Sequence, residues 1–229
     1  MLDLKDRTIC AKSSGLPLAR IAANITIGIP LSQQTIPTRT SGNVCVKAPV
    51  FPFIKLRGLD PAPGPEMKST GEVFGSHKDA DIAYLKARLA TEVPVAKEGG
   101  VYLTVRDEDK ENLVPIAKQL QDLGFKLYAT PGTADVLRES DVTVEIVYRI
   151  MERMHPDALD LMRQGKISFI VNVPTISGGA VRDGNMMRRL AVELNIPFVT
   201  TIRGAKMEVA AIAAMMKGEM EPVRLQVNY

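Results

Sequence analysis

The chain has 229 residues, of which 45% are hydrophobic and 24% are charged, and its formal net charge is +3. This composition is typical of a globular protein and argues against a disordered chain. The small net charge argues against a dedicated nucleic-acid-binding protein, because such proteins usually carry clustered Lys and Arg. The apolar runs are shorter than the roughly 20 residues that cross a membrane, and no secretion leader is recognisable. We therefore expect a cytoplasmic protein whose partners include neither a membrane nor a nucleic acid.

Residues 1–98 show no regular alternation of elements, and we predict that they form one domain segment. Pro17 stands near the first turn of a helix-like run, and apolar residues recur at helical spacing between Ile82 and Leu89. Another run, dense in proline and glycine, is predicted to be a long ordered loop. The predicted elements are a helix over residues 16–28, a strand over 43–53, the loop over 59–75 and a helix over 78–92.

Residues 99–229 form the second predicted domain, in which short β-branched runs alternate with helix-like runs. Strands are predicted over residues 101–105, 125–130, 142–150, 167–173 and 196–201, and helices over 109–124, 133–140, 156–165, 185–195 and 205–218. This alternation calls for a five-stranded parallel sheet covered on both faces, and right-handed crossovers make it doubly wound. Ligands of such folds bind at the carboxyl ends of the strands, so function is expected in the strand-to-helix loops.

The junction between the second of these strands and its helix reads Thr130-Pro131-Gly132-Thr133. A turn requires the proline and the glycine, but it does not require two threonines. Free N–H groups and the positive dipole end of a helix attract an anion, and glycine lets the backbone approach it. Lys110, at the start of the preceding helix, adds a compact positive charge. We interpret this combination as a phosphate-binding site.

Other strand ends add hydroxyl and amide groups to the same edge of the predicted sheet. These residues are Thr104, Asn172, Thr175, Thr200 and Thr201. Each threonine taken alone is explained equally well as a helix N-cap or as an ordinary strand residue. Their convergence favours the phosphate site over those separate explanations.

Candidates for catalysis are scarce. His155 lies near Asp157 and would suit an acid–base pair, but an exposed position before a proline-started helix explains it better. Arg182 and Asp183 are interpreted as the start of the next helix. The sequence contains no G-x-x-x-x-G-K-[ST] phosphate loop. We predict neither a catalytic residue nor a metal site in this chain.

Three stretches resemble one known family. "VFPFIKLRGLDPAPGPEMKSTGEVFG" (residues 50–75) resembles the end of the second ATP-grasp unit of the carbamoyl-phosphate synthase large subunit, and "AKSSGLPLARIAA" (residues 11–23) is similar to the helix before it. "TVRDEDKENLVPIAKQLQDLGFKLYATPGTADVL" (residues 104–137) resembles the start of that subunit's C-terminal domain. The resemblance implies a methylglyoxal-synthase-like fold preceded by an incomplete α+β ATP-grasp remnant.

The resemblance also implies a role. The complete synthase makes carbamoyl phosphate from ammonia, bicarbonate and two ATP, for arginine and pyrimidine synthesis. Its C-terminal domain binds a nucleotide monophosphate effector of the UMP or IMP type through a phosphate pocket. Thr104 stands where the family has a serine in its first strand, and the family motifs match Lys110, Thr130, Thr133 and Asn172. Thr200 or Thr201 falls in paired threonines that hold an amine effector in some members. Arg149 replaces a lysine at the pocket edge, whereas Ala48 replaces a glutamate used for the amine effector.

The family's Glu-x-Asn-Pro-Arg phrase, which supplies metal ligands of the ATP site, does not occur in this sequence. We therefore expect no cofactor in this chain, and ATP with Mg²⁺ or Mn²⁺ only in the complete synthase. The expected partners are the effector, the remaining part of the large subunit and a glutaminase small subunit. Two alternatives remain open. One is a triose-phosphate lyase like methylglyoxal synthase, whose Gly-Gly-Asp phrase is replaced here by "ERMHPD". The other is a structural subunit that completes a split synthase.

Overall fold

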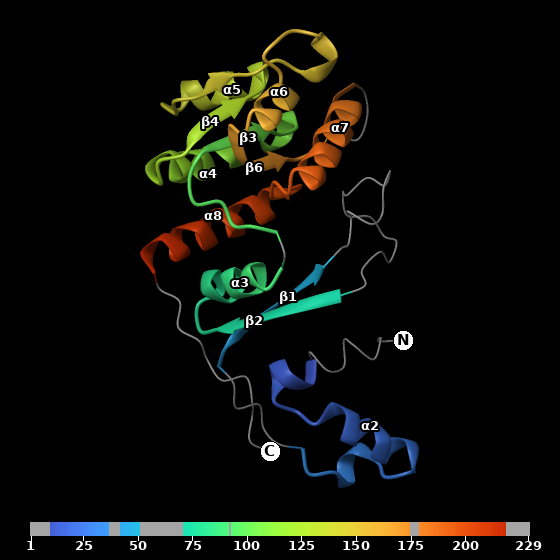
Figure 1. Cartoon of the computed structure of the whole chain (residues 1–229). Helices are drawn as coiled ribbons and strands as arrows, with labels where there is room; N and C mark the ends of the chain where they lie inside the picture. Colours follow the sequence, from blue (N-terminus) through green and yellow to red (C-terminus); the bar gives the residue numbers. More distant parts are fainter. Residues whose placement is uncertain (1–9, 37–41, 51–70, 92, 175–178, 219–229) are drawn as a thin grey trace.

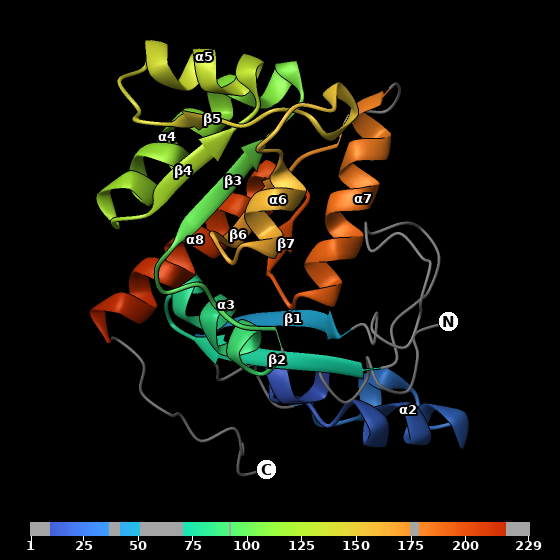
Figure 2. The ribbon, with the colours of Figure 1, turned by 45° about the horizontal axis from the view of Figure 1, so that its top comes forward.

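The structure is a computed structural model and describes residues 10–36, 42–50, 71–91, 93–174 and 179–218. Its larger sheet has five parallel strands in the order β5-β4-β3-β6-β7 (Figures 1 and 2). The strands are β3 (Gly100–Thr104), β4 (Lys126–Ala129), β5 (Glu145–Ile146), β6 (Ile167–Asn172) and β7 (Phe198–Val199). From β3 the chain first runs outward to β4 and β5, and then continues on the other side with β6 and β7. The predicted doubly wound parallel sheet is therefore confirmed.

Helices cover both faces of this sheet. They are α4 (Lys110–Asp122), α5 (Pro131–Glu139), α6 (Ala158–Arg163), α7 (Gly179–Glu193) and α8 (Ile202–Lys217), with 3₁₀ turns η2 (Asp107–Asp109) and η3 (Ile150–Glu152). Side chains alternate along each strand, so Val101 and Leu103 of β3 pack into the core with α4, α5 and α8, whereas Tyr102 packs into the core with α6 and α7. This alternation explains why the strand is apolar throughout.

The third predicted strand is much shorter than expected. Residues 142–150 were predicted as one strand, but only Glu145 and Ile146 pair with a neighbour, opposite Tyr128 and Ala129. β5 is the edge strand, and both of its residues are exposed. The valines around it are buried, because the segment packs on the core without extending the ladder. Burial of a β-branched run thus does not by itself indicate a long strand.

The first segment contains a separate antiparallel pair, β1 (Val44–Val50) and β2 (Gly71–His77), with α3 (Ala80–Leu89) packed against it. The predicted loop over 59–75 is wrong at its end, because residues 71–75 belong to β2, and residues 59–70 lie outside the described part. The reason is that Pro and Gly concentrate before residue 71, and the following residues pair with β1. Gly75 allows α3 to approach, since a Cβ there would lie 2.0 Å from the carbonyl oxygen of Ala83.

The predicted first helix is present as α2 (Leu18–Thr26), followed by the 3₁₀ turn η1 (Leu31–Gln33). None of the residues of α2 is buried. The next helix, α3, behaves differently, since it packs against α8 and places Ile82 and Leu85 in the same core as Val209 and Ile212. None of the helices among the described residues is long and apolar enough to cross a bilayer.

Candidate functional site

A cavity of about 330 Å³ opens at the carboxyl ends of β3 and β6. This is where the strand order switches direction, the place where doubly wound sheets bind ligands. Six of the predicted site residues line it, namely Thr104, Lys110, Thr130, Thr133, Arg149 and Asn172. Thr104 and Asn172 end adjacent strands and stand opposite each other in the ladder.

Thr130 and Thr133 form one wall of the cavity at the start of α5. Thr130 is the N-cap residue and its backbone carbonyl accepts from the N–H of Ala134 at 2.8 Å, but its side chain makes no capping hydrogen bond. Instead the Thr130 hydroxyl donates to the Thr133 hydroxyl at 3.3 Å, and both side chains are buried. The N-cap explanation for the Thr130 side chain is therefore wrong. Two hydroxyls remain beside the positive end of a helix dipole.

Lys110 begins α4 and extends over the same helix start. A Cβ on Gly132 would lie 3.0 Å from the Lys110 Nζ, so the missing side chain leaves room for the amine above the first turn of α5. The Lys110 Nζ forms an ion pair with Asp107 Oδ1 at 2.7 Å. This hydrogen bond holds the pKa of the Asp107 carboxyl below its ordinary value. The Asp107 side chain is 93% exposed, so an incoming anion can displace it from the amine.

The cavity lining also contains an acidic group that the sequence interpretation missed. Asp183 was predicted to mark a helix start, but α7 already begins at Gly179, and Asp183, just after the first turn, lines the cavity. Burial raises the pKa of the Asp183 carboxyl, against the lowering effects of the Met151 backbone N–H and of Arg149. Its Oδ1 atom is buried and has no hydrogen-bond partner among the described residues. Asp183 therefore adds a carboxylate to the cavity lining, with one of its two oxygens buried and unpartnered among the described residues.

Tyr102 of β3 lines the cavity on this acidic side. Burial, and then the charge of Asp183, raise the pKa of the Tyr102 hydroxyl above its ordinary value. The phenol therefore stays protonated and remains a hydrogen-bond donor. The alternation along β3, which directs Tyr102 and Thr104 to the same face of the strand, is the signal that would have added Tyr102 to the predicted site.

Three other predicted site residues, Gly132, Thr200 and Thr201, are not among the residues that line this cavity. Gly132 contributes indirectly, because its missing side chain leaves room for the Lys110 amine. Thr200 and Thr201 follow β7, and the Thr201 hydroxyl accepts from the N–H of Gly204 at 3.0 Å as the N-cap of α8. The alternative weighed for single threonines, a helix cap, thus applies to Thr201. Thr175 lies outside the described residues.

His155 makes a different contact from the one considered from the sequence. It is exposed, as expected, but its Nδ1 lies 2.5 Å from Asp160 Oδ2 rather than pairing with Asp157. Asp157 is the N-cap of α6 and accepts from the Asp160 backbone N–H at 2.9 Å. These capping contacts account for the cluster that His155, Asp157 and Asp160 form at the surface.

Comparison with known proteins identifies the class. Residues 112–200 match the MGS-like domain family, in agreement with the doubly wound sheet and with the position of the cavity.

The particular relatives are consistent with the motifs in the sequence. The chain is 44% identical over 222 residues to the carbamoyl phosphate synthase large chain, C-terminal section, of Methanocaldococcus jannaschii, covering 92% of this chain. It is 44% identical over 208 residues to the protein of the same description from Methanopyrus kandleri, covering 88% of this chain. A carbamoyl phosphate synthase large chain of Methanosarcina barkeri is 40% identical over 91% of this chain. The resemblance read from the motifs is therefore confirmed, and the chain corresponds to the C-terminal section of such a large chain. It spans 36%, 38% and 52% of the length of these three relatives.

Proposed function

We propose that this chain is a regulatory C-terminal part of a carbamoyl-phosphate synthase large subunit and that it binds a nucleoside monophosphate of the UMP or IMP type. The single observation that carries the proposal is the convergence of the Thr130 and Thr133 hydroxyls and the Lys110 amine on the first turn of α5 within one cavity. Hydroxyls, a flexible cation and a helix N-terminus together suit a phosphate.

We assign different parts of the ligand to different residues of the cavity lining. The phosphate lies against Thr130, Thr133 and Lys110, and Arg149 supplies a second cation at the cavity edge. The Asp183 carboxylate belongs to the remaining lining residues, and a carboxylate suits the hydroxyls or N–H groups of the nucleoside as a hydrogen-bond acceptor. A volume of about 330 Å³ is at the lower end of the range for small-molecule sites, as expected for a mononucleotide.

The chain by itself is not proposed to perform the synthase reaction. Its sequence has neither the Glu-x-Asn-Pro-Arg phrase nor a G-x-x-x-x-G-K-[ST] loop, so ATP and the divalent metal bind elsewhere in the complete synthase. The partners proposed are the remaining large-subunit portion and a glutaminase small subunit, in the cytoplasm, in the service of arginine and pyrimidine synthesis.

Calorimetric titration with UMP and with IMP tests the effector proposal. We expect heat of binding for at least one nucleotide, and Lys110→Ala to weaken that binding by about 1.5–3 kcal/mol, the scale of one charged hydrogen bond. Lys126→Ala is the matched control, because Lys126 is an exposed lysine on β4 that pairs with Glu145 outside the cavity. Folded protein that gives no heat with either nucleotide would overturn the effector proposal.

A second candidate is a triose-phosphate lyase, and Asp183 favours it. Such an enzyme needs a carboxylate base beside its phosphate site, and burial raises the pKa of Asp183 toward the range of a general base. The assay is production of methylglyoxal from dihydroxyacetone phosphate. Turnover that disappears in Asp183→Asn would establish the lyase, and the absence of methylglyoxal would remove it.

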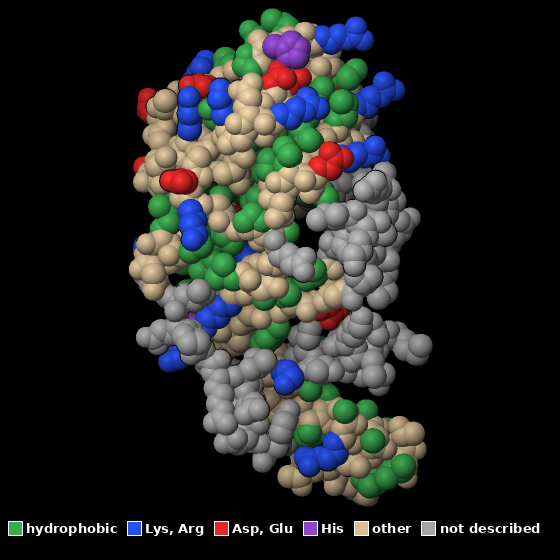
Figure 3. Space-filling view, viewed as in Figure 1, with side chains coloured by type: hydrophobic (Ala, Val, Ile, Leu, Met, Phe, Trp, Pro, Cys, Tyr) green, Lys and Arg blue, Asp and Glu red, His purple; other side chains and the backbone are tan. Residues whose placement is uncertain are grey.

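A third candidate is a structural subunit that completes a split synthase. Apolar side chains are exposed on and after α2, where Ile25, Ile27 and Leu31 are 49%, 75% and 52% exposed. Hydrophobic side chains are visible on the surface of this lobe at the bottom of Figure 3. Because the curated relatives are longer than this chain, the additional part of the large subunit is the proposed occupant of this surface. Co-purification of the chain with a separately expressed upstream part tests this candidate.

A further inference from the structure

Arg188 of α7 contacts Asn172 beneath the cavity. Its Nη1 donates to the Asn172 Oδ1 at 2.5 Å, and its Nη2 donates to the side-chain oxygen of Asn185. Arg188 is only 2% exposed and does not line the cavity itself. A guanidinium group has five N–H donors and no acceptor. The carboxamide atom that faces it must therefore be the oxygen.

This contact determines what Asn172 can offer to a ligand. With Oδ1 occupied by Arg188, the NH₂ group of Asn172 is turned away from the guanidinium, and it has no hydrogen-bond partner among the described residues. Asn172 lines the cavity at the end of β6. An unconstrained carboxamide presents either an acceptor or a donor, because it rotates by half a turn at little cost.

We propose that Arg188 is a positioning residue that makes Asn172 present only an N–H donor to the cavity, so that the site selects a ligand oxygen that accepts a hydrogen bond at this point. A phosphate oxygen and a base carbonyl both satisfy this requirement. The inference rests on the proposed effector function and specifies one of its contacts.

The backbone next to this pair leaves little freedom for another arrangement. A Cβ on Gly184 would lie 2.8 Å from Arg188 Nη1 and 3.2 Å from Asn172 Oδ1. The Arg188–Asn172 contact is thus enclosed by the first turns of α7. Close packing of this kind holds both side chains in one rotamer.

The experiment is a double-mutant cycle read by calorimetric titration with UMP and IMP. We expect Asn172→Ala and Arg188→Met each to weaken nucleotide binding by about tenfold, the loss of one hydrogen bond. In the Asn172→Ala background, Arg188→Met should change the affinity by less than about twofold. Arg188→Lys, which still donates to Oδ1, should retain most of the affinity. An equal effect of Arg188→Met in both backgrounds would overturn the positioning role.

Asn172→Asp is a second test that does not depend on removing the buried arginine. An aspartate keeps the contact with Arg188 as an ion pair but leaves no N–H donor at this position. We expect a folded protein whose nucleotide affinity falls by at least tenfold, from the lost donor and the added negative charge. Wild-type affinity in this variant would refute the donor assignment. The same titrations separate two kinds of failure. A wild-type chain that binds no nucleotide overturns the effector proposal, whereas a wild-type chain that binds nucleotide with an unchanged Asn172→Asp variant overturns only the positioning role.

Discussion

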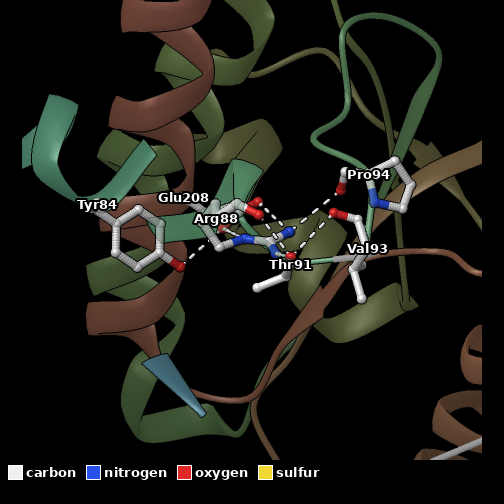
Figure 4. Close-up of polar contacts among 6 residues, drawn as sticks. All are labelled: Tyr84, Arg88, Thr91, Val93, Pro94 and Glu208. Atoms are coloured by element: carbon white, nitrogen blue, oxygen red, sulfur yellow. Dashed lines mark hydrogen bonds and ion pairs between the residues drawn. The ribbon is translucent and has the colours of Figure 1, made fainter. Parts of the chain in front are cut away.

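Glu208 of α8 forms a buried, bidentate ion pair with Arg88 of α3 (Figure 4). Arg88 Nε donates to one carboxylate oxygen at 2.8 Å and Nη2 donates to the other at 3.0 Å, and Glu208 is only 1% exposed. The Tyr84 hydroxyl also donates to Glu208 at 2.8 Å, and burial and this carboxylate raise the pKa of the Tyr84 hydroxyl. The contact therefore joins α3, in the first predicted domain, to α8, which packs on the parallel sheet.

Removing one partner of this pair should be strongly destabilising. Arg88→Met leaves the Glu208 charge buried, and we expect the free energy of unfolding to fall by about 3–5 kcal/mol. The double variant Arg88→Met with Glu208→Leu should recover part of this loss, because no unpaired charge remains. Denaturant unfolding measures both. The exposed pair Lys126–Glu145 is the control, and Glu145→Gln should cost less than about 1 kcal/mol. If Arg88→Met lowered the free energy of unfolding by no more than Glu145→Gln does, the result would contradict the buried contact.

Gly132→Ala tests the placement of Lys110 over α5. The new methyl group would lie 3.0 Å from Nζ, which is the end of a flexible side chain, so the lysine moves and the fold is retained. We expect a several-fold loss of nucleotide affinity with unfolding free energy unchanged or raised, because alanine favours the helix. Gly42→Ala serves as the control, because an added Cβ there would meet no atom within 4 Å in the part of the chain that the structure describes, its two chain neighbours aside. Undiminished affinity in Gly132→Ala would show that Lys110 lies elsewhere in the bound state.

Asp107 should oppose anion binding, because its carboxylate forms an ion pair with the Lys110 amine and so competes with the anion for it. We expect Asp107→Asn to tighten binding of inorganic phosphate and of the nucleotide by about two- to fivefold, the scale of one exposed charge pair. Glu108→Gln removes the same charge one residue away, where the carboxylate faces Arg106, and should have a smaller effect. Equal effects of the two variants would mean that only net charge matters.

Asp183 predicts a pH dependence of stability. Its pKa is raised in the folded protein, so the folded state binds the proton more tightly than the unfolded chain. The contribution of Asp183 to stability is then fully present below the ordinary carboxyl pKa of 3.8 and is lost as the pH rises through the raised value. Asp183→Asn should therefore be more stable than wild type at pH 7, and the difference should shrink on acidification. Thermal unfolding between pH 3.5 and 7 measures it, and a difference that grows at low pH would contradict the assigned burial.

Limited proteolysis separates the two parts of the first segment. α2 has no buried residue, whereas α3 shares a core with the parallel sheet and α8 and carries Arg88. We expect early cleavage within residues 16–36 and resistance across residues 80–91 in the isolated chain. Mass spectrometry of the fragments identifies the sites. Cleavage of both regions at equal rates would argue against the tight attachment of α3.

The sequence predicted the parallel sheet and most of the residues that line the cavity near the start of α5, because both depend on local signals. Strand-to-helix alternation is visible along the chain, and Thr130, Thr133 and Lys110 lie at predicted junctions. Asp183 was missed because its place in the cavity lining depends on where α7 begins. Tyr102 was missed because its place depends on the alternation of side chains along β3. The short β5 and the position of α3 depend on tertiary neighbours, which local patterns do not contain.

The central claim, a phosphate site at the start of α5, is tested most directly by comparing nucleotides with their nucleosides. Titration with UMP against uridine, and with IMP against inosine, isolates the contribution of the phosphate group. We predict that the nucleotide that binds does so at least about 100-fold more tightly than its nucleoside, because several charged hydrogen bonds are lost with the phosphate. Lys110→Ala should reduce the ratio between the affinity for the nucleotide and the affinity for its nucleoside. A nucleoside that binds as tightly as its nucleotide, with no change in Lys110→Ala, would contradict the account.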